Sequence, residues 1–152
     1  IREESSGIPP RTTLMGGHSG GTKKELEELL QFVRDIRFER MGAFPYSHED
    51  GTYAYKHYKD SISDEVKQER MDELMALQER IAYEINEAKI GQELKVIIDR
   101  EDGDYYIGRT EFDSPEVDPE VLIGKDKKLN IGMFYNVKIT DAQPFDLYGK
   151  VI

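Results

Sequence analysis

The dominant hydrophobic period of this chain of 152 residues changes close to Gly91. Before Gly91, the longest apolar patterns have the three- and four-residue spacing of amphipathic helices. After it, they alternate with polar residues, as in half-buried strands. Two periods in two successive blocks favour two structural units of different class. The sequence therefore predicts an α/β half followed by an all-β half.

The first half predicts a strand, a helix and a second strand. Residues 11–17 (RTTLMGG) are typical of a short buried strand, and residues 40–46 are typical of another. Between them, an apolar stripe indicates a helix over residues 23–37. Thr22 and Glu25 have the spacing of a capping box at its start. Short connections between these elements predict a parallel βαβ unit.

Two parallel strands and one helix cannot cover both faces of a sheet, so we expect this unit to be the end of a larger α/β sheet or barrel. The chain also begins at Ile1 instead of Met, which favours a fragment of a longer protein. Residues 48–61 are polar and rich in Tyr and predict a long loop. Ser61 and Ser63 then supply an N-cap for a long helix that extends to about Ala88.

The second half predicts a small barrel. Leu94, Val96 and Ile98 alternate with other residues, the EDGD stretch at 101–104 indicates a turn, and further strands follow at 105–110 and 135–139. About five short antiparallel strands in about 62 residues suggest a closed β-barrel of the size of an oligonucleotide-binding fold.

Composition excludes several classes of function. The chain has no Cys, so it can form no disulfide, thiolate zinc site or iron–sulfur cluster through its own residues. Its formal net charge is −10, which makes nucleic acid an unfavourable default partner. No apolar run reaches the roughly 20 residues of a membrane span. No signal-peptide pattern is present, and we expect a cytoplasmic protein without membrane contact.

Five stretches of the sequence resemble one family. The stretches GRTEFDSPEVD at 108–118 and IGMFYNVKITDAQPFDLYGKV at 131–151 resemble the TRAM domain of the methylthiotransferases. Three upstream stretches are similar to the RimO-type members, which modify a small-subunit ribosomal protein. They are RTTLMGGHSGGT at 11–22, MGAFPYSHEDGTYAY at 41–55 and VKQERMDELMALQERIAYEINEAKIGQ at 66–92.

The resemblance implies a fold and an activity. Residues 1–62 would be the C-terminal end of a radical S-adenosylmethionine partial (β/α) barrel, 63–90 a connecting helix, and 91–152 a five-stranded antiparallel, OB-like TRAM barrel. The full-length enzyme would use S-adenosylmethionine and two [4Fe-4S] clusters, whose cysteines lie upstream, to methylthiolate an aspartate of a ribosomal protein. We expect this chain alone to be inactive and to hold neither a cluster nor another metal.

A candidate cofactor site follows the first two strands. Ligands of parallel α/β folds bind at the carboxyl ends of strands, and we expect the cofactor mouth to be lined by Gly17, Gly20, Thr22, Tyr46 and Ser47. A plain tight turn is the alternative. A phosphate cradle is disfavoured because the glycine run lacks the P-loop lysine. The chain also departs from the family's usual Gly-x-Pro-Gly-Glu-Thr, with Ser19 replacing Pro and Gly21 replacing Glu.

A candidate substrate site lies in the acidic stretch of the second half. We expect the substrate-binding residues to be Arg109, Glu111, Asp113, Glu116 and Asp118, and the partner to be a basic small-subunit ribosomal protein, free or in the ribosome. The alternative is a loop that only increases solubility.

Two rival functions remain open. A tRNA methylthiotransferase of the MiaB type would grip RNA with its TRAM domain, but residues 89–152 carry 9 Lys plus Arg against 13 Asp plus Glu, a net charge of −4. An RNA grip needs a basic face. A stand-alone adaptor without catalysis is the other rival, and it requires a native start near Ile1.

Side chains outside these two sites receive structural interpretations. The three histidines, His18, His48 and His57, lack metal-ligand spacing and are expected in exposed loops. The tyrosines at 53, 55 and 58 either pack on a neighbouring domain or belong to an ordinary surface loop.

Overall fold

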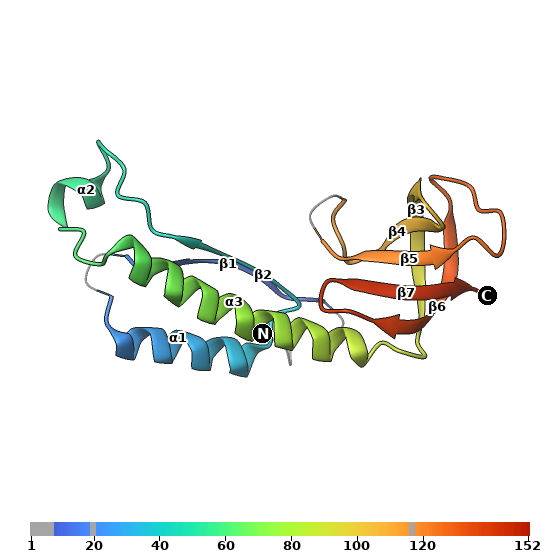
Figure 1. Cartoon of the computed structure of the whole chain (residues 1–152), viewed down its shortest axis with the longest axis horizontal. Helices are drawn as coiled ribbons and strands as arrows, with labels where there is room; N and C mark the ends of the chain where they lie inside the picture. The colour runs from blue at the N-terminus through green and yellow to red at the C-terminus, as the bar shows by residue number, and fades with distance from the viewer. Residues whose placement is uncertain (1–7, 19–20, 116–117) are drawn as a thin grey trace. The chain divides into compact units, whose positions relative to one another are not determined.

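The computed structural model describes residues 8–18, 21–115 and 118–152. The chain divides into two compact units, Pro10–Ile81 and a second unit that contains Ala82–Ile152. The boundary falls within the long helix α3 (Asp64–Glu87), which Figure 1 labels. Each unit has its own sheet and its own set of buried residues, and each is described here by itself.

The first unit contains the expected βαβ arrangement. Strand β1 (Arg11–Gly16) is followed by helix α1 (Lys23–Ile36) and strand β2 (Arg40–Pro45). The two strands pair in parallel, in a continuous register from Arg11 with Arg40 to Gly16 with Pro45. The prediction of a parallel βαβ unit is confirmed.

The predicted capping box is present at the start of α1. The Glu25 amide donates to Thr22 Oγ1 at 3.2 Å, and the Thr22 amide donates to Glu25 Oε2 at 2.5 Å. These reciprocal bonds satisfy two backbone donors that have no partner within the helix. They fix where the chain turns from the glycine-rich loop into α1.

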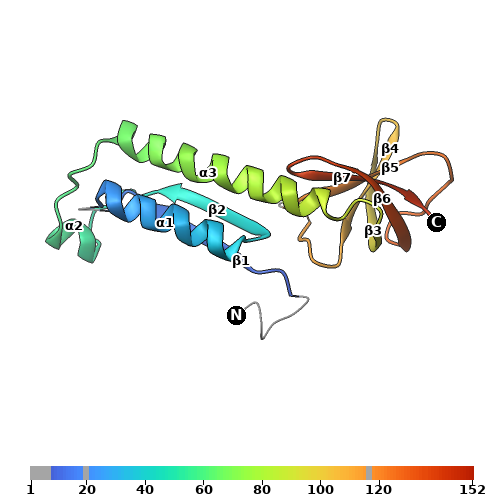
Figure 2. The ribbon, with the colours of Figure 1, turned by 90° about the horizontal axis from the view of Figure 1, so that it is seen from below.

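The two faces of the β1–β2 sheet differ in exposure. Figures 1 and 2 show α1 and the first part of helix α3 (Asp64–Glu87) running alongside these strands. The buried residues of the unit come from both helices and from β2 with its flanks. They include Leu30, Val33, Phe38, Met41, Tyr46, Met71, Leu74, Leu77 and Ile81. On the other face, the paired Met15 and Phe44 are 63% and 61% exposed.

The predicted loop at 48–61 contains a short helix, so that prediction is wrong in part. Helix α2 (Tyr53–His57) begins after Thr52, whose hydroxyl accepts from the Tyr55 amide at 3.1 Å. This cap was the local signal for a helix. Five residues are too few to show an apolar period, which is why the sequence pattern missed it.

The second unit is a closed barrel of five strands, as expected. The strands are β3 (Glu93–Asp102), β4 (Tyr105–Thr110), β5 (Glu120–Gly124), β6 (Phe134–Ala142) and β7 (Asp146–Val151), joined in the order β3-β4-β5-β7-β6. The expectation of a wholly antiparallel barrel is wrong, because β5 and β7 pair in parallel and the sheet is mixed. The parallel pair closes the ring, and such a non-local pairing leaves no mark in hydrophobic alternation.

Two irregularities bend the strands around the barrel core. The register shifts between Ile98 and Arg100 in the β3–β4 pair, and between Ile139 and Asp141 in the β6–β7 pair. Bulges of this kind increase local twist and help a short sheet to curve. The core inside holds mainly alternating aliphatic residues, including Val96, Ile98, Val121, Ile123, Val137, Ile139 and Leu147.

The last turn of α3 is fastened to this barrel. The Asn86 side-chain amide, which is buried, donates to the carbonyl oxygens of Gln143 and Pro144 at 3.0 and 3.3 Å. These carbonyls belong to the turn between β6 and β7. Across the residues with described coordinates, none of the helices has the length and apolar character needed to cross a membrane.

Candidate functional site

The carboxyl ends of β1 and β2 meet at one edge of the first unit. The Tyr46 amide donates to the Gly16 carbonyl at 2.7 Å, so the chain leaving β2 stays paired with the chain leaving β1. Gly17 follows directly and has a φ of +78°, which favours glycine. A Cβ at Gly17 would lie 2.6 Å from Lys67 Cγ, so close packing of α3 also requires glycine there.

Lys67 of α3 contacts two carboxylates and an aromatic ring at this edge. Its side chain is only 3% exposed, and its Nζ lies 2.6 Å from Asp60 Oδ2 and 3.2 Å from Asp64 Oδ1. The same Nζ lies 5.6 Å from the centre of the Tyr46 ring. The hydrogen bond with Asp60 raises the pKa of Lys67, and the hydrogen bond from Lys67 lowers the pKa of Asp60. Lys67 therefore remains charged although it is buried.

A pocket of about 280 Å³ opens beside this edge. Its polar lining includes Gly17, Thr22, Glu25 and Arg70, while methionine and leucine side chains form the apolar part. Arg70 Nη1 donates to the Gly21 carbonyl at 3.0 Å. The hydrogen bond from the Thr22 backbone lowers the pKa of Glu25, so the pocket presents a carboxylate and a guanidinium together.

The structure brings two residues of the predicted cofactor site together in one pocket. Gly17 and Thr22 line the pocket, but Tyr46 and Ser47 are not among its lining residues. The Tyr46 hydroxyl lies 2.8 Å from His48 Nδ1, and the Ser47 hydroxyl donates to Glu49 at 2.5 Å. Gly20 lies outside the described residues.

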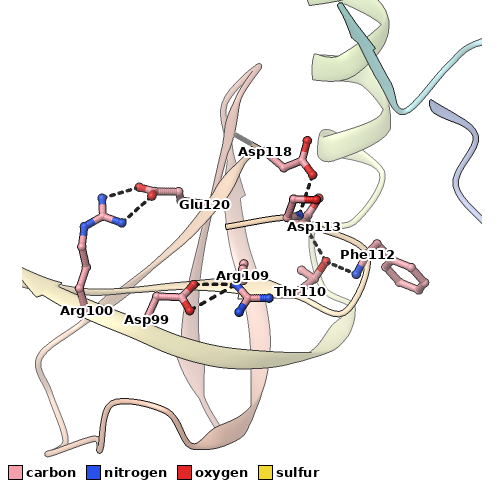
Figure 3. Close-up of polar contacts among 9 residues, drawn as sticks. Asp99, Arg100, Arg109, Thr110, Phe112, Asp113, Asp118 and Glu120 are labelled. Atoms are coloured by element: carbon pink, nitrogen blue, oxygen red, sulfur yellow. Dashed lines mark hydrogen bonds and ion pairs between the residues drawn. The ribbon is translucent and has the colours of Figure 1, made fainter. Parts of the chain in front are cut away.

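The predicted substrate residues of the barrel lie around β4 and the segment after it. Figure 3 shows Arg109 of β4 and Asp99 of β3 pointing toward each other, with Nε 3.0 Å from Oδ2. Asp99 lies at the bulge of β3, which turns its side chain toward the neighbouring strand. Arg109 is therefore held by an internal ion pair.

Two of the acidic side chains shape the segment that follows β4. Thr110 Oγ1 donates to Asp113 Oδ2 at 2.6 Å in a buried pair, and the Ser114 amide donates to Asp118 Oδ2 at 2.7 Å. Figure 3 shows the contact between Thr110 and Asp113. Glu111, in contrast, is exposed. Glu116 lies outside the described residues.

A further ion pair was not anticipated. Arg100 Nη1 and Nη2 contact Glu120 Oε1 and Oε2 at 2.6 and 3.0 Å in a bidentate pair, and this hydrogen bonding raises the pKa of Arg100. Lys67 was also not singled out from the sequence. It lies four residues before Met71 on the same helical stripe as Leu74, so a charged residue on an apolar stripe was the available signal. Within the described residues, no cluster of three or more His, Cys, Asp or Glu side chains could hold a metal ion.

Comparisons with known proteins found relatives that cover both units. The family described as TRAM domain matches residues 90–152. The chain is 62% identical, over its whole length, to "Ribosomal protein uS12 methylthiotransferase RimO" of Parabacteroides distasonis. The resemblance to the RimO-type methylthiotransferases is confirmed.

Two further relatives of the same name are also similar to this chain over its whole length. Identity is 64% to the protein of the same name from Phocaeicola vulgatus and 51% to that from Cytophaga hutchinsonii, and each alignment covers 100% of this chain. The chain spans about a third of the length of these relatives, since it covers 35% of each.

Proposed function

We propose that this chain acts as the C-terminal part of a radical S-adenosylmethionine methylthiotransferase that modifies an aspartate of a small-subunit ribosomal protein. The observation that carries the proposal is the identity of 62% to a RimO-type relative across both units, not across the barrel alone. The name of that relative specifies the ribosomal protein uS12 as its substrate. In this proposal, the TRAM barrel recognises the protein substrate, and the protein works in the cytoplasm.

The residues of this chain do not fit an iron–sulfur cluster, because the sequence contains no Cys. The proposal therefore assigns both [4Fe-4S] clusters to other parts of the whole enzyme, and no step involving them is attributed to this chain.

The pocket beside β1 fits the polar part of S-adenosylmethionine, which carries an ammonium group, a carboxylate and hydroxyls. Glu25 can accept from the ammonium group, and Arg70 can pair with the carboxylate. When bound, S-adenosylmethionine supplies the methyl group and the hydrogen-abstracting chemistry. Gly17 allows the backbone to lie close to a ligand, and the Thr22 cap holds the start of α1 beside it.

The decisive experiment uses the whole enzyme that contains this chain. The purified, cluster-loaded enzyme is incubated with S-adenosylmethionine, a sulfur source and either the uS12 protein or tRNA, and the products are analysed by mass spectrometry. We expect a methylthio group on an aspartate of uS12 and none on tRNA. Modification of tRNA alone would favour the MiaB-type alternative, although the barrel's acidic character does not support it.

A further inference from the structure

Helix α2 and its flanks present an aromatic surface that the proposed reaction does not use. Tyr53, Tyr55 and Tyr58 are 68%, 45% and 50% exposed. We call these three side chains the aromatic platform. Within the described part of the chain, none of their hydroxyl groups has a hydrogen-bond partner. Three exposed rings on one short segment concentrate apolar surface, and such a concentration is typical of a binding surface.

The platform is braced by a continuous series of ring contacts. Tyr53 stacks on His57 with ring centres 3.8 Å apart and planes 14° apart, and its edge contacts Tyr58 at 6.2 Å. Tyr58 contacts His18 at 5.7 Å, and Tyr55 contacts His48 at 4.8 Å. Both histidines pack on the buried Tyr46, at 4.9 and 5.8 Å. The rings are therefore positioned before any partner arrives.

Two lysines lie beside the tyrosines of the platform. Residues 52–59 (TYAYKHYK) contain no acidic residue, while Glu49 and Asp50 precede them and Asp60, which pairs with Lys67, follows them. Lys56 and Lys59 are exposed, and neither has an ion pair among the residues with described coordinates. Elsewhere, cations such as Lys67, Arg100 and Arg109 are each paired with a carboxylate.

We propose that the aromatic platform binds a single-stranded segment of RNA. Exposed rings stack on unpaired bases, and adjacent lysines neutralise phosphates. A double helix cannot offer base faces to these rings, and a basic protein segment would be repelled by Lys56 and Lys59. This contact adds a nucleic-acid partner to the proposed function. It lies in the first unit, in contrast to the TRAM-based grip weighed from the sequence.

The test measures RNA binding by the full 152-residue chain and needs no methylthiolation. An unstructured, labelled RNA of about 10 nucleotides is titrated with each variant and followed by fluorescence anisotropy. We expect Tyr53→Leu and Tyr55→Leu each to weaken binding roughly tenfold, because each removes a stacking face. Tyr53→Phe keeps the ring and should stay within about twofold of the wild type. Lys56→Gln should reduce the slope of log K against log salt by about 0.7.

The matched control is Tyr83→Leu, since Tyr83 is an exposed tyrosine of α3 outside the platform. Leucine favours helices more than tyrosine does, and far-UV circular dichroism verifies folding of each variant. Wild-type RNA affinity in both platform leucine variants would overturn the proposal, as would an equal loss in Tyr83→Leu. If these variants instead lose affinity for the uS12 protein but not for RNA, the platform is a protein contact and the proposal is wrong.

Discussion

At the scale of single residues, Lys67 shows how a charged side chain can belong to a packed interior. Its stem lies against Gly17, and its ammonium group contacts Asp60, Asp64 and the face of Tyr46. Burial of an ammonium group is costly unless it is paired. Lys67 therefore stabilises this arrangement while its carboxylate partners, chiefly Asp60, are ionised.

The Lys67–Asp60 pair predicts how the stability of the first unit depends on pH. The pKa of Asp60 is lowered, so its contribution is present above the unfolded value of about 3.9 and is lost as pH falls through the folded pKa. The pKa of Lys67 is raised, so its contribution is complete below about 10.4 and is lost as pH rises through the folded pKa. We expect the unit to melt highest between these limits.

Thermal melts of the helical circular dichroism signal across pH 2–12 would check this expectation. The double variant Asp60→Asn with Lys67→Met removes both titrating groups and should have a lower melting temperature and a flatter pH profile at both extremes. Identical pH slopes in the wild type and the double variant would contradict the prediction. Glu79→Gln, an exposed change on α3, is the matched control.

In the second unit, Asn86 is likewise a buried polar side chain with hydrogen-bond partners. We predict that Asn86→Ala destabilises the barrel by about 1–3 kcal/mol, because the two hydrogen bonds that the buried Asn86 amide donates to the carbonyls of Gln143 and Pro144 are lost. Chemical unfolding followed by tyrosine fluorescence gives the free energy, since the chain has no Trp. Glu87→Ala alters the same helical turn at an exposed position and should cost far less. Equal losses would show that the amide bonds are unimportant.

At the scale of secondary-structure elements, sequence reasoning succeeded where the signals are local. The Thr22 capping box, the Ser63 cap of α3 and the alternation within β3 each involve residues a few positions apart. It failed where partners are distant in the chain. The parallel β5–β7 pair joins segments 26 residues apart, as Glu120 with Asp146. No periodicity reports such a pairing.

The same distinction between local signals and distant partners applies to the candidate sites. The glycine-rich loop and Thr22 could be recognised as the end of a strand and the start of a helix. The partner of Arg109 could not, because it depends on a bulge that directs Asp99 across the sheet. Asp113 and Asp118 have internal hydrogen-bond partners that composition alone does not reveal.

The two sheets should also differ in local stability. In the described structure, β1 and β2 each have one strand neighbour, whereas every barrel strand has two. Local opening is easiest where few strands and buried contacts must separate. We predict that the amides of β1 exchange with solvent before the amide of Val137, which lies fully buried in β6. Native-state hydrogen exchange resolved by NMR tests the order, and earlier exchange at Val137 would refute it.

At the scale of the whole molecule, the net charge of −10 favours encounters with basic proteins. Glu111 is the best reporter of this effect in the proposed substrate site. It is exposed, whereas changing Asp118 would also remove the acceptor of the Ser114 amide. We predict that Glu111→Gln weakens binding of the uS12 protein up to about fivefold at low salt, mainly through slower association.

Stopped-flow association rates at two salt concentrations would measure the effect. The difference between the wild type and Glu111→Gln should shrink as salt increases, because screening acts over about 8 Å at physiological ionic strength. Glu79→Gln removes the same charge from α3 and should change the rate less. An equal change in both variants would mean that net charge, and not the segment after β4, guides the substrate.

The position of β7 in the barrel has a consequence for synthesis of the chain. β7 is the last of the barrel strands to be made, yet it lies between β5 and β6 in the ring. Until the residues through Val151 emerge, the other four strands can form only an open sheet, with unpaired edges on β5 and β6. Such edges readily pair with other chains. A premature stop codon ahead of Asp146 would therefore yield an aggregating polypeptide. Loss of the single strand β7 would prevent the whole barrel from closing.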